Sequence, residues 1–446
     1  MFDLTIGELI ILLFTVLFGF YMAWTIGAND VANSMGTVFG SGRLSLKRII
    51  IIAAVFEFLG AFLVGAHVTK TLKGGIVDPM YFQDEQFFSG DTGIYIFIAG
   101  MLAVLLAASL WVTLATYKSL PISTSQSIVG AVAGFGTVAV LLGDIPLKAM
   151  SGETLIEISI GWVLSPVLGG IMSFLVFLLI RKAIFNSSEP EERAQKLISF
   201  FIALVFFIII LAGISGGLKN LRETLESILP LTIVDVIFEE SWLRVLVVGV
   251  LSTVLGVLGG IYVRRSKKLR NLKSVDRVES MFGGLLILTA CYVAFAHGAN
   301  DVANAIGPVA AISQVIFKHE ISSSVEIPVW ILVLGGAGIV VGVSTWGYKV
   351  MNTIGKKITK ITPTRGFAAS FGAASSVLIC SLFGIPVSTS QIIVGAVIGV
   401  GLAGGITAID LRVIRNIIIS WVFTIPIAAA TTAVLFLVFR IVALNI

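Results

Sequence analysis

Charged residues are scarce in this sequence. Only 12% of its 446 residues are Asp, Glu, Lys or Arg, and 57% are hydrophobic, whereas about a quarter of the residues in a soluble domain carry a charge. The shortage excludes an ordinary soluble protein. Apolar runs such as 160–180, 197–214 and 245–263 are long enough to cross a bilayer as helices. The alternation of apolar and polar residues typical of a membrane barrel is missing, so the sequence predicts an all-α polytopic membrane protein.

Cysteine and histidine are also rare. The two cysteines, Cys291 and Cys380, lie in apolar segments, where we expect them to be small core residues. The three histidines and two cysteines show no spacing typical of a metal site, and no pair of nucleophile and base is recognisable. We therefore expect neither a cofactor nor an enzyme.

The few charges are distributed unevenly between the predicted loops. If the loop with Arg43, Lys47 and Arg48 is cytoplasmic, the loops on that side hold 22 of the 30 basic residues and 6 acids, against 16 acids on the other side. This bias follows the positive-inside rule and accounts for the net charge of +5 without a nucleic-acid partner. It predicts an integral protein of the plasma (cytoplasmic) membrane with both termini outside.

Residues 1–26 lack the features of a cleavable signal and are read as the first helix. The twelve predicted crossings are 8–27, 49–68, 93–115, 125–143, 158–180, 197–215, 242–263, 281–298, 328–347, 366–383, 387–405 and 416–443.

Two phrases occur twice in the chain. Residues 27–33 (GANDVAN) return unchanged as residues 298–304, and residues 121–126 (PISTSQ) return as residues 386–391 (PVSTSQ). The predicted topology separates the starting points of the two copies by seven crossings, an odd number, so the second copy is inverted in the membrane. The sequence therefore predicts three regions. They are a first inverted repeat over 1–180, a linking region with two crossings and basic cytoplasmic loops over 181–280, and a second inverted repeat over 281–446.

The GANDVAN phrase places a carboxylate and two carboxamides inside or beside the membrane. An acid at that depth is costly unless it meets a partner or a cation, and no Lys or Arg is predicted there. We expect the helix to be broken at this phrase, because Gly36 or Gly307 follows each copy and Pro308 interrupts the second. The break would free backbone carbonyls, and a hard monovalent cation prefers carboxylate, carboxamide and carbonyl oxygens. The alternative is that the side chains cap helix starts. The predicted cation ligands are Asn29, Asp30, Asn300 and Asp301, with Asn33 and Asn304 as additional candidates.

The second phrase opens with a proline, which favours the first turn of a helix. A helix start inside the membrane presents free amides, hydroxyls and the positive end of the helix dipole, and this combination suits a tetrahedral oxyanion without Lys or Arg. The alternatives are ordinary helix capping and polar contacts between helices. The predicted oxyanion-binding residues are Ser123, Thr124, Gln126, Ser388, Thr389 and Gln391.

Glu57 is the third acid predicted within the membrane. Aligning Gly65 with Gly342 places Leu334 opposite Glu57, so we expect no equivalent acid in the second half. Glu57 could then bind an additional cation, carry a proton or pair with a neighbour. His297 directly precedes the second GANDVAN phrase, and a histidine can titrate near neutral pH, but we expect local hydrogen bonding as its role.

Both doubled phrases resemble the signatures of the inorganic phosphate transporter (PiT) family, and the resemblance covers nearly the whole chain outside 181–280. It implies secondary active symport of inorganic phosphate with sodium ions or protons, two inverted repeats, membrane re-entrant helical hairpins and a homodimer. Asp30 and Asp301 match the family's essential aspartates, and Glu57 matches a glutamate of its first half. The missing second acid departs from members that have acids in both halves. Some predicted crossings, notably 125–143 and 387–405, are then expected to be hairpin arms.

With this resemblance, the cations are expected to be sodium ions and the oxyanion is expected to be phosphate. Hairpin hydroxyls, those of Ser125 and Ser390, join the sodium ligands, and Glu57 is included with them. Bound sodium neutralises the acids near the midplane, and phosphate then docks between the ions and the hairpin tips, since two bare carboxylates would repel it. The abundance of neutral oxygens favours sodium over protons. The alternatives are a proton-coupled phosphate or sulfate permease of the same fold, a passive anion channel, and a membrane receptor or structural protein.

Overall fold

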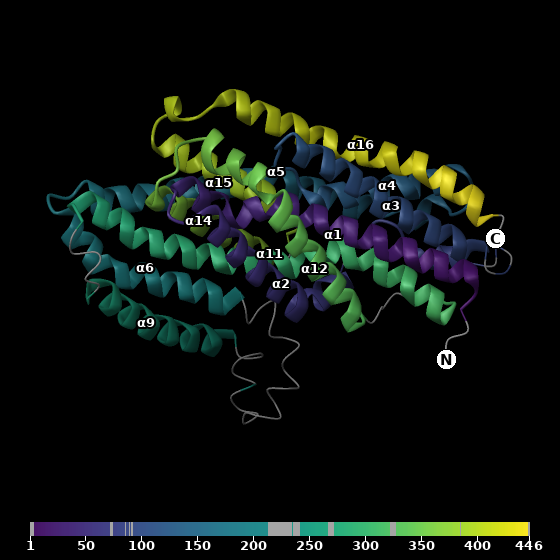
Figure 1. Cartoon of the computed structure of the whole chain (residues 1–446), viewed down its shortest axis with the longest axis horizontal. Coiled ribbons are helices and arrows are strands. Elements are labelled where there is room, and N and C mark those ends of the chain that lie inside the picture. Colours follow the sequence, from purple (N-terminus) through teal and green to yellow (C-terminus); the bar gives the residue numbers. More distant parts are fainter. Residues whose placement is uncertain are drawn as a thin grey trace.

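The computed structural model describes residues 4–444 except for 72–74, 85, 89, 91, 213–233, 235–240, 266–271, 322–326 and 384. In this part of the chain the fold is all-helical, with two isolated antiparallel bridges and no strand. Figure 1 shows an elongated bundle in which most helices follow the long axis. The helices are α1 (Ile6–Ser41), α2 (Leu46–Thr71), α3 (Thr92–Tyr117), α4 (Thr124–Leu141), α5 (Gly152–Ile180), α6 (Pro190–Ala212), α9 (Ser241–Arg265), α11 (Ser274–Lys318), α12 (Val329–Thr345), α13 (Gly347–Asn352), α14 (Pro363–Leu382), α15 (Thr389–Ala403) and α16 (Leu411–Ala443).

Among the described residues, nine helices are long and apolar enough to cross a membrane, and ten if the pair α12 and α13, bent by 56°, counts as one span. Each of the twelve predicted crossings coincides with a helix, apart from residues 213–215 of the crossing 197–215, which lie outside the described residues. However, α15 has only 15 residues, or about 22 Å at 1.5 Å per residue, which is too short for a hydrocarbon core of about 30 Å. Twelve complete crossings are therefore not confirmed.

The helices α3 and α4 form a pair whose base lies at one end of the molecule. We call this the terminal end, because α1 begins there and α16 ends there (Figure 1). Just beyond α4, Asp144 accepts two hydrogen bonds from Arg440 near the end of α16, from Nε at 2.9 Å and from Nη2 at 2.6 Å. The bridge between Val77 and Met150 joins the segments before α3 and after α4. This base therefore lies beside the end of α16.

The helices α14 and α15 form a second pair with its base at the opposite end. The bridge between Thr359 and Ile409 joins the segments before α14 and after α15, and α16 begins directly after it at Leu411. The two pairs therefore enter the bundle from opposite ends. Their turns both reach the middle of α1, as the contacts of Asn29 and Asp30 described below establish.

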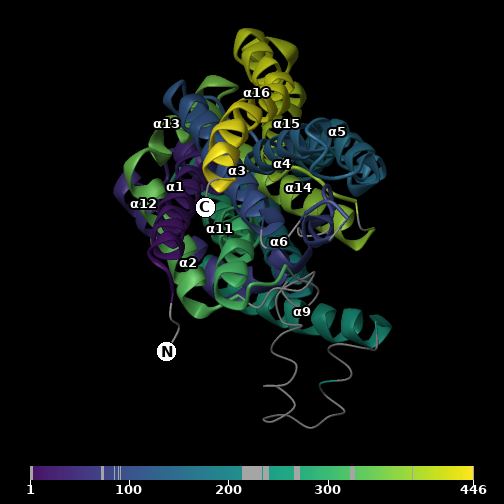
Figure 2. The same ribbon diagram turned by 90° about the vertical axis from the view of Figure 1, so that its right-hand side faces the viewer.

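Helices of the two sequence copies pack on each other. The helix α1 packs on α12 and α11 packs on α2, while α4 packs on α16 and α15 packs on α5. Glycines permit close approach at these contacts: Gly27 lies against the backbone of Ile339 on α12, and Gly298 lies against the backbone of Glu57 on α2. Small residues at helix contacts are typical of membrane proteins. In Figure 2, α11 and α3 lie near the centre of the bundle, and α9 lies at its edge below α6.

These glycine contacts fix which residues of α2 and α12 are equivalent. Gly60 lies against residues 295 and 299 of α11, and Gly342 lies against residues 24 and 28 of α1, which are the same positions of the two copies. The predicted alignment of Gly65 with Gly342 is therefore wrong by five residues: Gly342 corresponds to Gly60, and Gly65 corresponds to Gly347 at the start of α13. The residue equivalent to Glu57 is Ile339 rather than a leucine, so the second half still has no matching acid.

Candidate functional site

Asp30 contacts both copies of the second doubled phrase, PISTSQ (121–126) and PVSTSQ (386–391), which we write together as PxSTSQ. It lies in the middle of α1 and its exposed fraction is 0%. Its Oδ2 accepts a hydrogen bond from the hydroxyl of Thr124 at 2.6 Å, and its Oδ1 accepts one from the hydroxyl of Ser390 at 3.1 Å. Thr124 begins α4 and Ser390 lies in the first turn of α15. One carboxylate of the first GANDVAN phrase therefore connects two helix starts that are far apart in the sequence.

The GANDVAN phrases lie inside continuous helices. The helix α1 runs unbroken from Ile6 to Ser41 and α11 from Ser274 to Lys318, even though Pro308 lies within α11. The prediction of a broken helix is therefore wrong, and so is the alternative that these side chains cap helix starts. Their carboxylates and carboxamides are free to face other helices.

The PxSTSQ phrases divide their polar side chains between two tasks. Ser123 and Ser388 cap α4 and α15: their hydroxyls accept hydrogen bonds from the backbone N–H groups of Gln126 at 3.2 Å and Gln391 at 3.4 Å. The capping alternative is thus correct for these two serines. The next residues of each phrase point instead towards the GANDVAN phrases.

The two additional candidate asparagines make matching contacts with the opposite copy. The amide of Asn33 donates to the hydroxyl of Ser390 at 2.8 Å, and the amide of Asn304 donates to the hydroxyl of Ser125 at 3.3 Å. Each asparagine ends a GANDVAN phrase, and each serine belongs to the PxSTSQ phrase of the other copy. The second half of the chain therefore completes the polar site of the first, and the first completes that of the second.

A histidine lies at the centre of the three predicted acids. The Nε2 atom of His297 lies 2.6 Å from Oδ2 of Asp301 and 3.8 Å from Oδ2 of Asp30, and its Nδ1 lies 3.8 Å from Oε1 of Glu57. The hydroxyl of Ser34 donates to Oε1 of Glu57 at 3.2 Å. All of these side chains are buried. One ligand atom each from Asp30, His297 and Asp301 lies within 4.8 Å of the other two, which is a donor set able to hold a cation.

Only local hydrogen bonding was predicted for His297, and Ser34 was not predicted at all. A usable signal was present for the histidine: it precedes Asp301 by four residues, so both side chains lie on one face of α11. No comparable signal exists for Ser34, because its contact with Glu57 depends on how α1 packs near α2.

Asn29 and Asn300 occupy the same position in identical phrases and were both predicted to bind a cation, but their surroundings differ in the structure. Asn29 is buried, and its amide nitrogen donates to the hydroxyl of Thr116 at 2.8 Å and to the carbonyl of Leu120 at 3.1 Å. Its oxygen accepts from the backbone N–H of Ile122 at 3.2 Å. Asn300 is exposed instead. It lines a cavity of about 50 Å³ between α11, α14 and α15, together with Asn33, His297 and Thr389.

Replacing Asn29 by Ala is therefore expected to lower stability, whereas the same change at Asn300 is not. The first replacement leaves a buried hydroxyl, carbonyl and N–H without their partner, at a cost of about 1–3 kcal/mol. Thermal unfolding of the purified proteins in detergent measures the difference. Equal melting temperatures for the two variants would contradict the assignment of Asn29 to the turn between α3 and α4.

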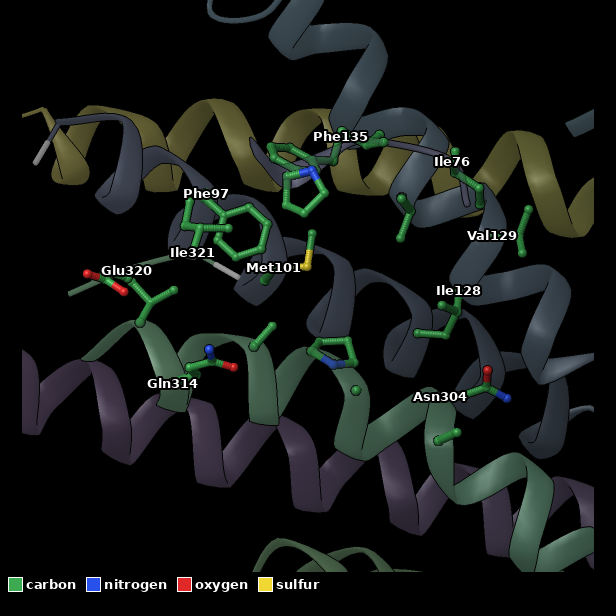
Figure 3. Close-up of a pocket in the computed structure, with 18 residues that line it drawn as sticks. Ile76, Phe97, Met101, Ile128, Val129, Phe135, Asn304, Gln314, Glu320 and Ile321 are labelled. Atoms are coloured by element: carbon green, nitrogen blue, oxygen red, sulfur yellow. The ribbon is translucent and has the colours of Figure 1, made fainter. Parts of the chain in front are cut away.

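A second cavity, of about 110 Å³, leads towards Asn304 from the terminal end. Figure 3 shows Asn304 and Gln314 on α11 facing apolar side chains, among them Phe97 and Met101 of α3. Glu320 lies at the far end of the cavity, next to His319, whose Nε2 is 3.6 Å from Oε1 of Glu8 near the start of α1. The polar centre is thus approached by separate cavities beside the two helix pairs.

The sequence matches a known family over most of its length. Residues 26–432 match the profile of a family described as the phosphate transporter family. The chain belongs to the phosphate transporter family. Membership confirms the resemblance predicted from the two doubled phrases, and with the apolar helices it makes the protein an integral membrane transporter rather than an enzyme.

Its relatives include proteins from archaea and plants. A protein of Pyrococcus horikoshii named "Putative phosphate permease" is 39% identical over 437 residues, which cover 97% of this chain and 98% of that protein. "Inorganic phosphate transporter 2-1, chloroplastic" of Arabidopsis thaliana is 39% identical over 445 residues, covering 95% of this chain and 71% of that protein. A solved structure named "The sodium-dependent phosphate transporter" is 38% identical and superposes with a TM-score of 0.79, over 97% of this chain and 99% of that one.

Proposed function

We propose that this protein is a secondary active symporter that imports inorganic phosphate together with sodium ions. The observation that carries the proposal is the convergence on Asp30, a buried carboxylate that accepts hydrogen bonds from Thr124 and Ser390 and lies beside Asp301 and His297. Buried acids of this kind require compensating positive charge. The sodium dependence named for the similar solved structure supports sodium as that charge.

The order of binding follows from electrostatics. Phosphate beside an uncompensated carboxylate is repelled by about 4 kcal/mol per pair of unit charges at 4 Å and an effective dielectric constant of 20. Sodium ions held by Asp30 and Asp301, with hydroxyls such as those of Ser125 and Ser390, remove this repulsion. Phosphate then binds at the helix starts of α4 and α15. Because the anion binds well only after the cation, the two fluxes are coupled.

Alternating access requires a part that moves around this site. We assign that role to two inverted repeats, 1–180 and 281–446, in which α3–α4 and α14–α15 are re-entrant hairpins and 181–280 is a linking region. Their entry from opposite ends supports this assignment, since rocking of one repeat against the other would open the site to each side in turn. The terminal end is then extracellular, with both termini outside the plasma membrane, and the working assembly is a homodimer.

One contact favours a second candidate, a proton-coupled phosphate permease. His297 lies 2.6 Å from Asp301, and histidine is the side chain best suited to exchange protons near neutral pH. In that case the proton would replace one of the sodium ions as the compensating charge.

Uptake of labelled phosphate into proteoliposomes, with sodium and proton gradients imposed separately, tests the proposal. Sodium-coupled symport predicts concentrative uptake under an inward sodium gradient at equal pH on both sides. Concentrative uptake under a proton gradient alone would support the proton-coupled candidate instead. Phosphate flux that never exceeds equilibrium under either gradient would identify a passive anion channel and overturn symport.

A further inference from the structure

The starts of α4 and α15 share an incomplete capping motif. In a capping box, the N-cap hydroxyl accepts from the N–H of the third helical residue, and the side chain of that residue accepts from the N–H of the N-cap. Thr5 and Glu8 at the start of α1 form both bonds, at 3.2 Å and 2.7 Å. Ser123 with Gln126 and Ser388 with Gln391 form only the first.

The missing half of each motif leaves a glutamine oxygen without a donor. Gln126 and Gln391 are exposed by only 2% and 3%, and the Oε1 atom of each is buried with no hydrogen-bond partner among the residues that the structure describes. At α15, the N–H that would complete the motif donates instead to the hydroxyl of Ser165 on α5, at 2.9 Å. Buried acceptors are normally satisfied, so the same unmet acceptor in both copies points to a donor that the protein does not supply.

Each glutamine directly follows a serine of the polar site. Gln126 follows Ser125, which contacts Asn304, and Gln391 follows Ser390, which contacts Asp30 and Asn33. The donor is therefore to be sought among the molecules that enter this site. Of the two solutes that the proposed function places there, sodium and phosphate, phosphate is the one that carries a hydrogen-bond donor, its P–O–H group.

We propose that Gln126 and Gln391 are specificity-determining residues, whose side-chain oxygens accept hydrogen bonds from the P–O–H groups of protonated phosphate and thereby select phosphate over sulfate. At neutral pH phosphate carries one O–H as the dianion or two as the monoanion and can satisfy one or both glutamine oxygens, whereas sulfate has none and leaves both unsatisfied. A site built to bond a substrate O–H rejects an analogue that lacks it strongly, because its own polar groups stay unpaired. The inference rests on the proposed function.

Competition by three anions, arsenate, selenate and sulfate, against labelled phosphate uptake separates hydrogen bonding from size. Arsenate resembles phosphate in keeping an O–H, while selenate and sulfate lack one, and arsenate and selenate are both larger than phosphate and sulfate. The variants are Gln126→Met, Gln391→Met and the double variant, since methionine retains the length of glutamine without an acceptor amide. Gln195→Met, on α6 and bonded to Glu191, is the matched control.

In the wild type and the control, arsenate is expected to compete strongly, and selenate and sulfate only weakly. Each glutamine variant is expected to reduce the ratio of the sulfate inhibition constant to the phosphate KM by about tenfold, with selenate following sulfate and the sodium dependence unchanged. An unchanged ratio in active variants would overturn the inference. A loss of sodium affinity that is equal for all anions would also overturn it, because the oxygens would then be cation ligands. If instead the wild type transports no phosphate, the proposed function itself has failed.

Discussion

Replacing Asp30 by Asn is expected to abolish sodium-stimulated phosphate uptake. The carboxamide keeps the shape of the side chain and an oxygen for one of the hydroxyls of Thr124 and Ser390, but it removes the charge that holds the cation. The lost attraction is about 4 kcal/mol at 4 Å and an effective dielectric constant of 20, or roughly a thousandfold in sodium affinity. Initial rates of phosphate uptake at increasing sodium concentrations measure the effect.

The matched control is the same chemical change at Asp410. This residue caps α16 by accepting from the N–H groups of Arg412 and Val413, and asparagine is an equally good cap. Uptake by the Asp410→Asn protein should therefore equal that of the wild type. Sodium stimulation with wild-type affinity in the Asp30→Asn protein would remove Asp30 from the site.

Replacing Gly298 by Val is expected to destabilise the protein severely. A Cβ atom at this position would collide with the backbone of Glu57, which cannot move aside as a flexible side chain would. Separating α11 from α2 would also pull His297 and Asp301 away from Glu57. Overpacking in a core typically costs 1–3 kcal/mol, and we expect about 3 kcal/mol here because two backbones are in contact.

The equivalent contact predicts an equal effect in the other copy. Gly27→Val forces α1 away from the backbone of Ile339 on α12, so both variants should lose thermal stability and uptake together. Gly284→Val is the control, since nothing lies within 4 Å of a Cβ atom at that position of α11. If the Gly298 variant melts at the same temperature as the Gly284 variant, the close packing of α11 on α2 is not needed for the fold.

Most of the helices could be predicted from the sequence because its apolar runs are long, and the family could be predicted because the doubled phrases are distinctive. Within the described residues, every predicted crossing coincides with a helix, and the two doubled phrases identify the family. The alignment of α2 with α12 was not predictable, because either Gly60 or Gly65 could be paired with Gly342. Only the contacts of α2 with α11 and of α12 with α1 show which of the two alignments is correct.

The candidate site was predictable where a local phrase determines the chemistry. Asp30, Ser390 and Thr124 were all expected in it, and the structure brings them together. The different environments of Asn29 and Asn300 could not be predicted, because the two residues belong to identical phrases and differ only in what packs against them. The unsatisfied side-chain oxygens of Gln126 and Gln391 could not be predicted either, because the sequence of each phrase is that of an ordinary capping box.

Equilibrium binding of phosphate to the purified protein, measured with and without sodium, tests the central claim most directly. The account predicts saturable phosphate binding in sodium, almost none when choline replaces sodium, and loss of the sodium effect in the Asp30→Asn protein. Phosphate binding of equal affinity in sodium and in choline would contradict it.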